Sequence, residues 1–228
     1  MHSGGRGKRT ADFPALTGQK NGLTQGQTMF LKGQLHIHTT LSDGTMTPQE
    51  AADVYAGMGF DFLAFTDHDH LLKPSYREAI AAVRSEMLIF PGIELTVPCS
   101  KGYVHVSRIE GERDLLHIFN HPADYGLGLK ETLACLAEVA ARYPLDAIEV
   151  THHGFATPHF DIPGIGYPGV AADDAHERSG CGRGWIELDC ERRKDKIIAA
   201  IRRGDFRNGY AGRPSAFQER GRQKLQLV

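Results

Sequence analysis

Residues 34–44 read Gln-Leu-His-Ile-His-Thr-Thr-Leu-Ser-Asp-Gly, and this stretch indicates how the rest of the chain is organised. Apolar residues alternate with His36 and His38, which is typical of a β-strand. Because side chains alternate between the faces of a strand, both histidines share one face, where a metal ion could bridge them. The polar turn that follows can bring Asp43 back to the same position. A His-x-His pair is also common without a metal, so the recurrence of such residues downstream decides between the two interpretations.

The composition limits the class of protein. The chain has 228 residues and a formal net charge of -2, which suits one large α/β domain or at most two small ones. This charge argues against a general nucleic-acid-binding protein, which is usually strongly basic. No apolar run approaches membrane-spanning length. The four cysteines, Cys99, Cys135, Cys181 and Cys190, show no CxxC spacing, which favours reduced thiols in a cytoplasmic protein.

Strand and helix patterns alternate along the chain. A Thr47 N-cap followed by Pro and Glu predicts a helix that ends at Gly57, and further helices are expected over 74–86, 128–143 and 192–203. Expected strands cover 60–66, 87–94, 103–107, 115–122, 146–150 and 169–172. The alternation predicts a mostly parallel sheet, wound open or closed as a barrel. We expect a flexible tail over residues 1–29 and one domain over 30–228, with 213–224 either loose or a packed terminal helix.

Candidate metal ligands stand at the end of nearly every apolar strand. In parallel α/β architectures, functional groups collect at the carboxyl ends of strands. Nine imidazole and carboxylate ligands are too many for one ion and suit two or three divalent ions that share a bridging carboxylate. The mixture of nitrogen and oxygen ligands favours Zn, Mn or Fe over Ca. The nine residues are His36, His38, Asp43, His68, Glu94, His105, His121, Asp174 and His176.

Short motifs around these residues occur in a characteristic order between residues 34 and 176. They are His-x-His with Ser-Asp-Gly, Thr-Asp-His-Asp, Pro-Gly-Ile-Glu, Asn-His-Pro and Asp-Ala-His. As an ordered set, they resemble the PHP (polymerase and histidinol phosphatase) superfamily. The resemblance implies an α/β fold, a distorted (βα)7 TIM-like barrel of the PHP type, with a trinuclear metal site and phosphoesterase chemistry.

The resemblance also implies how the ligands are grouped. The first ion would be held by His36, His38, Glu94 and Asp174, the second by the bridging Glu94 with His105 and His121, and the third by Asp43, His68 and His176. Residues 172–174 read Ala-Asp-Asp where the family usually has Gly-Ser-Asp, so Asp173 competes with Asp174 as a ligand. The Asp-x-His spacing favours Asp174. The chain lacks the long insertion of the RNA- and nucleotide-cleaving branch, so we expect a more open substrate cleft.

These features predict a metal-dependent phosphoesterase that hydrolyses a small phosphorylated substrate. A hydroxide that bridges two metals would attack phosphorus, since coordination lowers the pKa of bound water to about 7. Lys101, Arg178 and Arg183 would bind the remaining phosphate charge, or else are ordinary surface cations. The alternatives are a metal-binding scaffold or regulatory module without catalysis, and a metallohydrolase that acts on a non-phosphate bond.

Two further residues are candidates for a catalytic role. Asp67 could orient the imidazole of His68 by a hydrogen bond, or simply form a turn. His153 follows a strand at the active end and could contact the substrate or protonate the leaving group, with His152 as the alternative. Glu149 could support a ligand from behind or merely end its strand.

Overall fold

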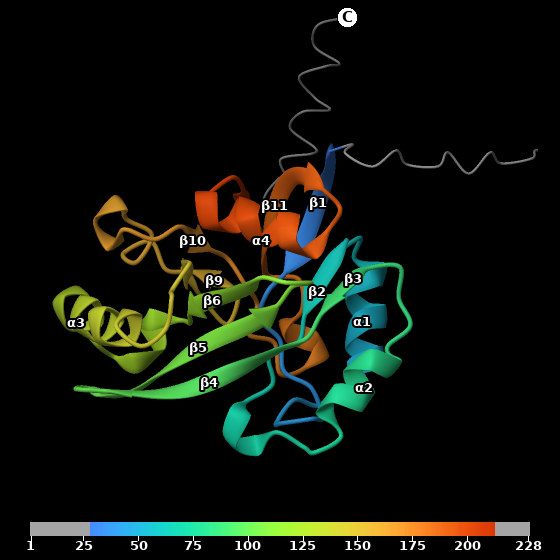
Figure 1. Ribbon diagram of the computed structural model, residues 1–228, viewed down its shortest axis with the longest axis horizontal. Coiled ribbons are helices and arrows are strands. Elements are labelled where there is room, and N and C mark those ends of the chain that lie inside the picture. The colour runs from blue at the N-terminus through green and yellow to red at the C-terminus, as the bar shows by residue number, and fades with distance from the viewer. Residues whose placement is uncertain (1–27, 213–228) are drawn as a thin grey trace, which may run out of the picture.

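Two five-stranded sheets and four α-helices make up residues 28–212, the part of the chain that the computed structural model describes (Figure 1). The first sheet has the order β12-β11-β1-β2-β3 and the second the order β10-β7-β6-β5-β4. The first contains β1 (Thr28–Gln34), β2 (Phe62–Ala64), β3 (Leu88–Phe90), β11 (Gly184–Glu191) and β12 (Arg207–Tyr210). The second contains β4 (Gly92–Cys99), β5 (Gly102–Glu110), β6 (Leu115–Phe119), β7 (Ala147–Glu149) and β10 (Gly169–Val170). A small hairpin of β8 (Thr151–His152) and β9 (Phe155–Ala156) follows β7.

Four α-helices lie within the described residues, and the first of them begins at the predicted cap. They are α1 (Pro48–Gly57), α2 (Tyr76–Ala82), α3 (Leu129–Ala140) and α4 (Lys194–Arg203). At α1 the Thr47 hydroxyl accepts from the Glu50 amide, while the Glu50 carboxylate accepts from the Thr47 amide. This reciprocal capping satisfies two amides that a helix start leaves unpaired. The expected helix over 74–86 is shorter than predicted, because only residues 76–82 are helical.

The strand pairing is mixed and not mostly parallel, which corrects the sequence prediction. Parallel pairs join β1 to β2, β2 to β3, β6 to β7 and β7 to β10, but β4, β5 and β6 pair antiparallel, as do β1, β11 and β12. The links at residues 100–101 and 111–114 are too short for a crossover helix, so β4, β5 and β6 form hairpins. The α/β class is therefore confirmed, whereas a closed (βα)7 barrel is not.

The two sheets meet at two seams, and both seams carry candidate ligands. At one, β3 runs into β4 with a single intervening residue, and His68 forms a parallel bridge with Glu94. At the other, the Asp174 amide donates to the His36 carbonyl, and the His38 amide donates to the Ala175 carbonyl, both at 3.0 Å. The sequence pattern placed His36 and His38 within a strand. In the structure β1 ends at Gln34, and both histidines follow it in an extended segment. Ligands from both sheets are consequently brought to one place.

Two expectations concern the ends of the chain. The predicted tail over 1–29 lies outside the described residues except for its last two positions, which belong to β1. The expected loose or helical segment over 213–224 also lies outside them. Within residues 28–212, no helix is both long and apolar enough to cross a membrane.

Candidate metal centre

The Glu94 carboxylate lies at the centre of a cluster of imidazoles and is fully buried. It comes from β4, next to the seam between the sheets. Asn120 donates a hydrogen bond of 2.7 Å to Glu94 Oε1 and so fixes the rotation of the carboxylate. Five histidine nitrogens lie within ion-pair distance of its two oxygens: those of His36 (3.3 Å), His38 (3.3 Å), His68 (2.9 Å), His105 (3.3 Å) and His121 (3.1 Å). One carboxylate is therefore approached by five histidines from four separate segments of the chain.

Asp174 is the second carboxylate of the buried part of the cluster. Its Oδ1 lies 3.4 Å from His36 Nε2 and 3.2 Å from His38 Nε2, while its Oδ2 lies 3.3 Å from His153 Nδ1. The neighbouring Asp173 points elsewhere and accepts hydrogen bonds from Tyr55 and from the backbone of residues 182–184. The geometry therefore brings Asp174, and not Asp173, to the histidines.

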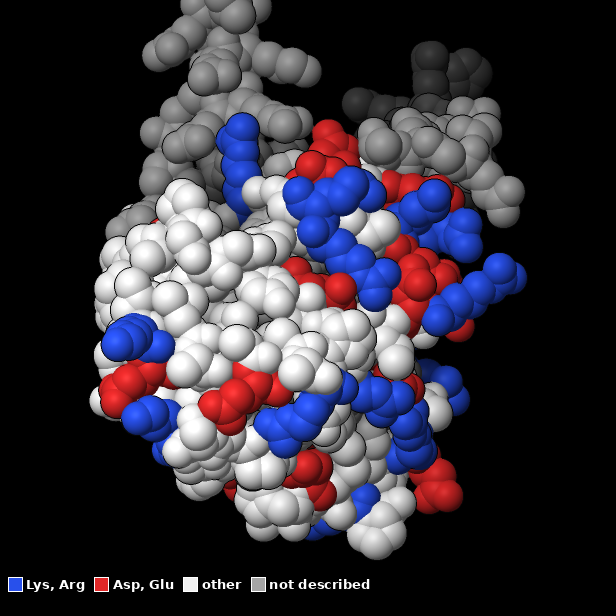
Figure 2. Space-filling view, turned by 60° about the vertical axis from the view of Figure 1, so that its left-hand side comes forward, with Lys and Arg blue, Asp and Glu red and all other residues white. Residues whose placement is uncertain are grey.

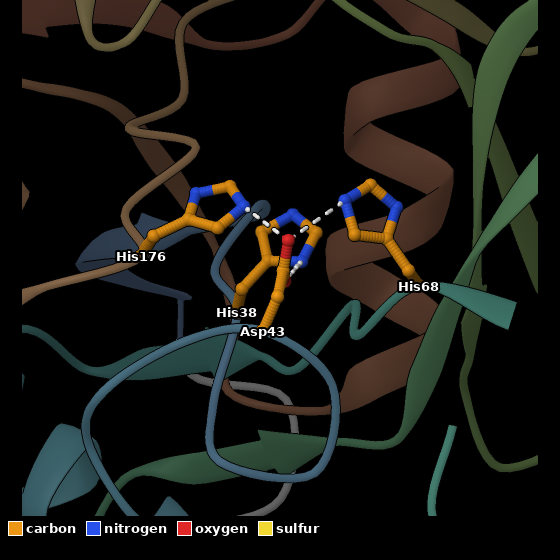
Figure 3. Close-up of side chains that lie close together, drawn as sticks. All are labelled: His38, Asp43, His68 and His176. Carbon is orange, nitrogen blue, oxygen red and sulfur yellow. Dashed lines mark ion pairs between the residues drawn. The ribbon is translucent and has the colours of Figure 1, made fainter. Parts of the chain in front are cut away.

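Asp43 forms the solvent-facing side of the cluster. Figure 3 shows its carboxylate between three imidazoles, at 3.5 Å from His38 Nδ1, 3.6 Å from His68 Nε2 and 3.4 Å from His176 Nε2. The Asp43 side chain is 39% exposed, whereas that of His38 is fully buried. The cluster is thus closed towards the protein core and open on the side of Asp43.

The loop that carries Asp43 is held by Asp67. The Asp67 carboxylate accepts hydrogen bonds from the amide and hydroxyl of Thr39 and from the Ser42 hydroxyl, at 2.8–3.0 Å. Gly44 is required in the same turn, because a Cβ there would lie 2.5 Å from the backbone of residue 38. No hydrogen bond joins Asp67 to the imidazole of residue 68 among the described residues, so Asp67 positions the Asp43 loop instead of that ring.

Backbone strain is concentrated at the cluster. Within the described part of the chain, the non-glycine residues with positive φ are His121 (24°), His153 (48°) and Asp174 (48°). Such conformations cost free energy and persist where the surrounding structure imposes them, often at functional sites. His121 lies against the Glu94 carboxylate and His153 against that of Asp174, so all three strained residues belong to the cluster.

All nine predicted ligands come together in this structure, but their grouping differs from the one that the resemblance implies. Four sets of side chains have ligand atoms within 4.8 Å of one another. They are His36, His38 and Asp174; His36, Glu94 and His121; His68, Glu94 and His105; and His38, Asp43, His68 and His176. His36, His38, His68 and Glu94 each belong to two sets, so three ions could share ligands more extensively than predicted.

The cluster leaves buried polar atoms without hydrogen-bond partners. They include Glu94 Oε2, Asp174 Oδ1 and the Nδ1 atoms of His38, His68 and His105. Buried polar atoms are nearly always paired, so five such atoms in one place require another group. Imidazole nitrogens and carboxylate oxygens are suitable ligands for Zn, Mn or Fe, and the residues present therefore fit divalent ions.

The electrostatics of the cluster also favour cations. Burial opposes ionisation of Glu94 and Asp174, but the surrounding histidines outweigh it and lower the pKa of both carboxyl groups, that of Glu94 strongly. Burial likewise opposes protonation of His36 and His38, yet the carboxylates raise the pKa of His36 well above its usual value and that of His38 to about 9. The carboxylates thus stay ionised, and protons or metal ions compete for the imidazoles.

Of the predicted catalytic and substrate-binding residues, some lie at the metal cluster and others lie away from it. His153 lies at the cluster with its side chain 54% exposed, and Arg183 donates to the His153 carbonyl at 3.3 Å. Lys101 pairs instead with Glu131 at 3.3 Å, at the far end of the β4–β5 hairpin from the cluster. Arg178 is exposed and lines a separate hollow beside α1. Only one of the three predicted cations, Arg183, is therefore brought to the site.

Two supporting residues were not assigned from the sequence. Glu149 is buried, and its Oε2 lies 2.8 Å from His36 Nδ1, so the Nε2 atom of that ring faces the cluster. The sequence left its role open. Asn120, which holds Glu94, stands directly before His121 in the Asn-His-Pro motif, and this position was the available signal.

Comparisons with known proteins are consistent with this arrangement. A protein-family profile described as PHP-associated matches residues 165–206. The chain is 34% identical over 73 residues to the 5'-3' exoribonuclease Rnm of Salmonella typhimurium, which is 32% of this chain and 25% of the relative. It is 36% identical over 72 residues to the 3',5'-nucleoside bisphosphate phosphatase of Chromobacterium violaceum, again 32% of this chain and 25% of the relative. The chain thus matches a quarter of the length of each of these relatives.

The fold is similar to that of a solved structure from Bacteroides vulgatus, a two-domain protein containing a predicted PHP-like metal-dependent phosphoesterase. The TM-score is 0.58 at 18% identity, and the alignment covers 91% of this chain and 70% of that chain. At this identity the likeness concerns the fold alone.

Proposed function

We propose that the protein is a metal-dependent phosphoesterase that hydrolyses a small phosphorylated molecule, which the PHP-associated profile match and the bisphosphate phosphatase among its relatives support. The observation that carries the proposal is the Glu94 carboxylate, which five histidines approach to within 2.9–3.3 Å. A buried carboxylate among so many imidazoles, with polar atoms left unpaired, is the arrangement expected of a centre that binds several cations.

The chain would hold two or three divalent ions, Zn, Mn or Fe, with the nine ligands named above. When bound, such ions supply Lewis acidity and lower the pKa of coordinated water. Glu149 would keep His36 in the tautomer that presents Nε2 to an ion, and Asn120 would hold Glu94 in its shared position.

Two residues on the open side would act on the substrate. His153 Nδ1 faces Asp174, and the ring is exposed, so its Nε2 atom can carry a proton to the leaving oxygen. The Arg183 guanidinium lies beside the same residue and would bind phosphate oxygens. Asp67 would act indirectly, by holding the loop that presents Asp43.

A small substrate agrees with the charge of the protein. The net charge is -2, and Figure 2 shows acidic side chains interspersed with basic ones on the face in view. A polymeric nucleic acid usually requires a continuous basic surface. The bisphosphate phosphatase among the relatives acts on a small phosphorylated molecule, which supports this choice, whereas the exoribonuclease acts on a polymer.

The proposal is tested by screening the metal-loaded protein against phosphate monoesters and diesters, with His38→Ala as the blank. We expect hydrolysis that chelation abolishes and that added Mn or Zn restores. Stoichiometric metal without hydrolysis of any ester would refute catalysis and favour the scaffold alternative. Equal turnover by the His38→Ala protein would refute the assignment of the site.

A further inference from the structure

Cys99 and Cys135 bring their sulfur atoms to 2.7 Å of each other, on different elements of the fold. Cys99 ends β4 and is partly exposed, whereas Cys135 lies within α3 and is buried. The other two cysteines behave differently, since Cys181 and Cys190 each donate to a backbone carbonyl. The pair at β4 and α3 lies outside the metal cluster, and the proposed hydrolysis makes no use of it.

We propose that Cys99 and Cys135 form a redox-active dithiol that peroxides oxidise to an intramolecular disulfide. A disulfide bond is about 2.0 Å long, so the two sulfur atoms need to approach by only about 0.7 Å. The two thiols face each other across the interface between β4 and α3, so the sulfur atoms are already placed for the bond to form.

Polar contacts between the β4–β5 hairpin and α3 keep the two sulfur atoms close to each other. Figure 1 shows α3 beside the end of the β4–β5 hairpin. The Ser100 amide donates to Glu138 Oε2 at 2.8 Å, Lys101 pairs with Glu131 at 3.3 Å, and the Arg142 guanidinium donates to the backbone carbonyl of residue 98. Residues 131, 135, 138 and 142 follow helical spacing and share one face of the helix and its C-terminal extension, so polar contacts flank the dithiol on both sides.

The two cysteines have different parts in the oxidation. Burial, together with the neighbouring Cys99, raises the pKa of Cys135 to about 11, so the more exposed Cys99 is the thiol that reacts first. Its thiolate attacks a peroxide oxygen, the O–O bond breaks, and Cys99 becomes a sulfenic acid while the peroxide is reduced to an alcohol or water. The Cys135 sulfur then attacks the sulfenic sulfur, the S–O bond breaks, and the released hydroxide leaves as water with the Cys135 proton. Two thiols are oxidised for each peroxide reduced.

The cross-link has a definite consequence for the protein. It would close a loop between positions 36 residues apart, and removing that freedom from the unfolded chain stabilises the fold. For a protein of this size we expect the melting temperature to rise by about 5–10 °C. Glu94 and His105 belong to the same hairpin, but they lie at the metal cluster, and a sulfur shift of about 0.7 Å leaves them in place. Oxidation should therefore stabilise the protein without removing its metal.

The test uses the full chain loaded with zinc, which is not redox-active. The protein is reduced, freed of reductant and treated with hydrogen peroxide, after which free thiols are counted and disulfide-linked peptides are identified by mass spectrometry. We expect the thiol count to fall from four to two, a linked peptide pair that contains Cys99 and Cys135, and an unchanged zinc content. Cys99→Ser should abolish the link and the rise in melting temperature, whereas Cys190→Ser, the matched control, should retain both.

Three results would overturn the proposal: four thiols that persist under peroxide, a link that involves other cysteines, or a loss of zinc on oxidation. The wild-type peptide map decides the first two without any variant, so poor folding of Cys99→Ser would not rescue the proposal. None of these measurements depends on phosphoesterase activity.

Discussion

Asp173 and Asp174 are adjacent in sequence, but their substitution should affect different properties. Loss of the Asp173 carboxylate should lower stability, whereas loss of the Asp174 carboxylate should lower the metal content. The buried Asp173 carboxylate accepts four hydrogen bonds, from the Tyr55 hydroxyl (2.7 Å) and from the amides of Gly182 (2.6 Å), Arg183 (2.8 Å) and Gly184 (2.7 Å). In Asp173→Asn the amide group can accept at one oxygen only. If its nitrogen replaces Oδ2, it faces both the Gly182 amide and the Tyr55 hydroxyl. The hydroxyl can rotate to accept from this nitrogen, but the Gly182 amide, a buried donor, loses its acceptor.

The magnitude follows from two opposing contributions. An unsatisfied buried donor costs about 1–3 kcal/mol. Burial raises the pKa of Asp173 in spite of its hydrogen bonds, so removing the charge returns part of the desolvation free energy. We therefore expect Asp173→Asn to lower the free energy of unfolding by about 1–2 kcal/mol, and Asp173→Ala, which deprives four donors, by about 4 kcal/mol or more. Tyr55→Phe removes one donor and should cost about 1 kcal/mol.

Asp174→Asn should reduce metal binding and leave the stability of the metal-free protein largely unchanged. Asp174 contacts His36 and His38 and no backbone amide of the 182–184 loop, so its loss should reduce the bound metal by at least one ion per chain. Stability is measured by urea unfolding of the metal-free proteins, and metal content by elemental analysis after dialysis against zinc. If Asp173→Asn lost metal while Asp174→Asn kept it, Asp173 would be the ligand and our interpretation of the geometry would be wrong.

Three further predictions concern supporting residues. Glu149→Ala should weaken zinc binding about 10–100-fold in calorimetric titration, because His36 loses the partner at its Nδ1. Glu149→Gln should weaken zinc binding less. Equal zinc affinity in the wild type and both variants would contradict the proposed role of Glu149 in orienting His36. Asp195 accepts hydrogen bonds from the amides of residues 112–114, and although burial opposes ionisation, these bonds lower its pKa. The stability that it provides is therefore present above about pH 4 and is lost as the pH falls through its lowered pKa, so the free energies of unfolding of wild type and Asp195→Asn should converge as the pH falls, and a constant gap would count against this. Arg183→Ala should raise KM for a phosphate ester about tenfold with unchanged metal content, since it removes a phosphate contact, and an unchanged KM would exclude that contact.

The fold was predictable where local chemistry determines it. The Thr47, Pro48 and Glu50 cap is sufficient to start α1, and the structure confirms it. Strand β11 was not predicted, although Ile186 and Leu188 alternate with polar residues, because its main partner β1 lies more than 150 residues away in sequence. Pairing direction depends on such distant partners, which is why the sheets turned out mixed and not mostly parallel.

The convergence of the nine candidate ligands was predictable from the sequence, whereas the contacts of the supporting residues were less so. Most of these residues stand in a short motif at the end of an apolar segment, and the folded chain keeps them there, although His105 lies within β5. The partners of Asp67 and Glu149 lie 28 and 113 residues away, so no local pattern could assign their roles. The partner of a long, flexible cation such as Lys101 depends on which carboxylate lies nearby in the folded protein. Lys101 pairs with Glu131 on α3, which the sequence around residue 101 could not indicate.

The central claim is that side chains from both sheets hold several divalent ions around one carboxylate. Anomalous diffraction at the zinc absorption edge, from crystals of the zinc-loaded protein, tests it most directly. We predict two or three strong peaks within coordinating distance of the nine ligands, at least one of them shared through Glu94. A map with no peak there, or with zinc bound only at other positions, would contradict the account.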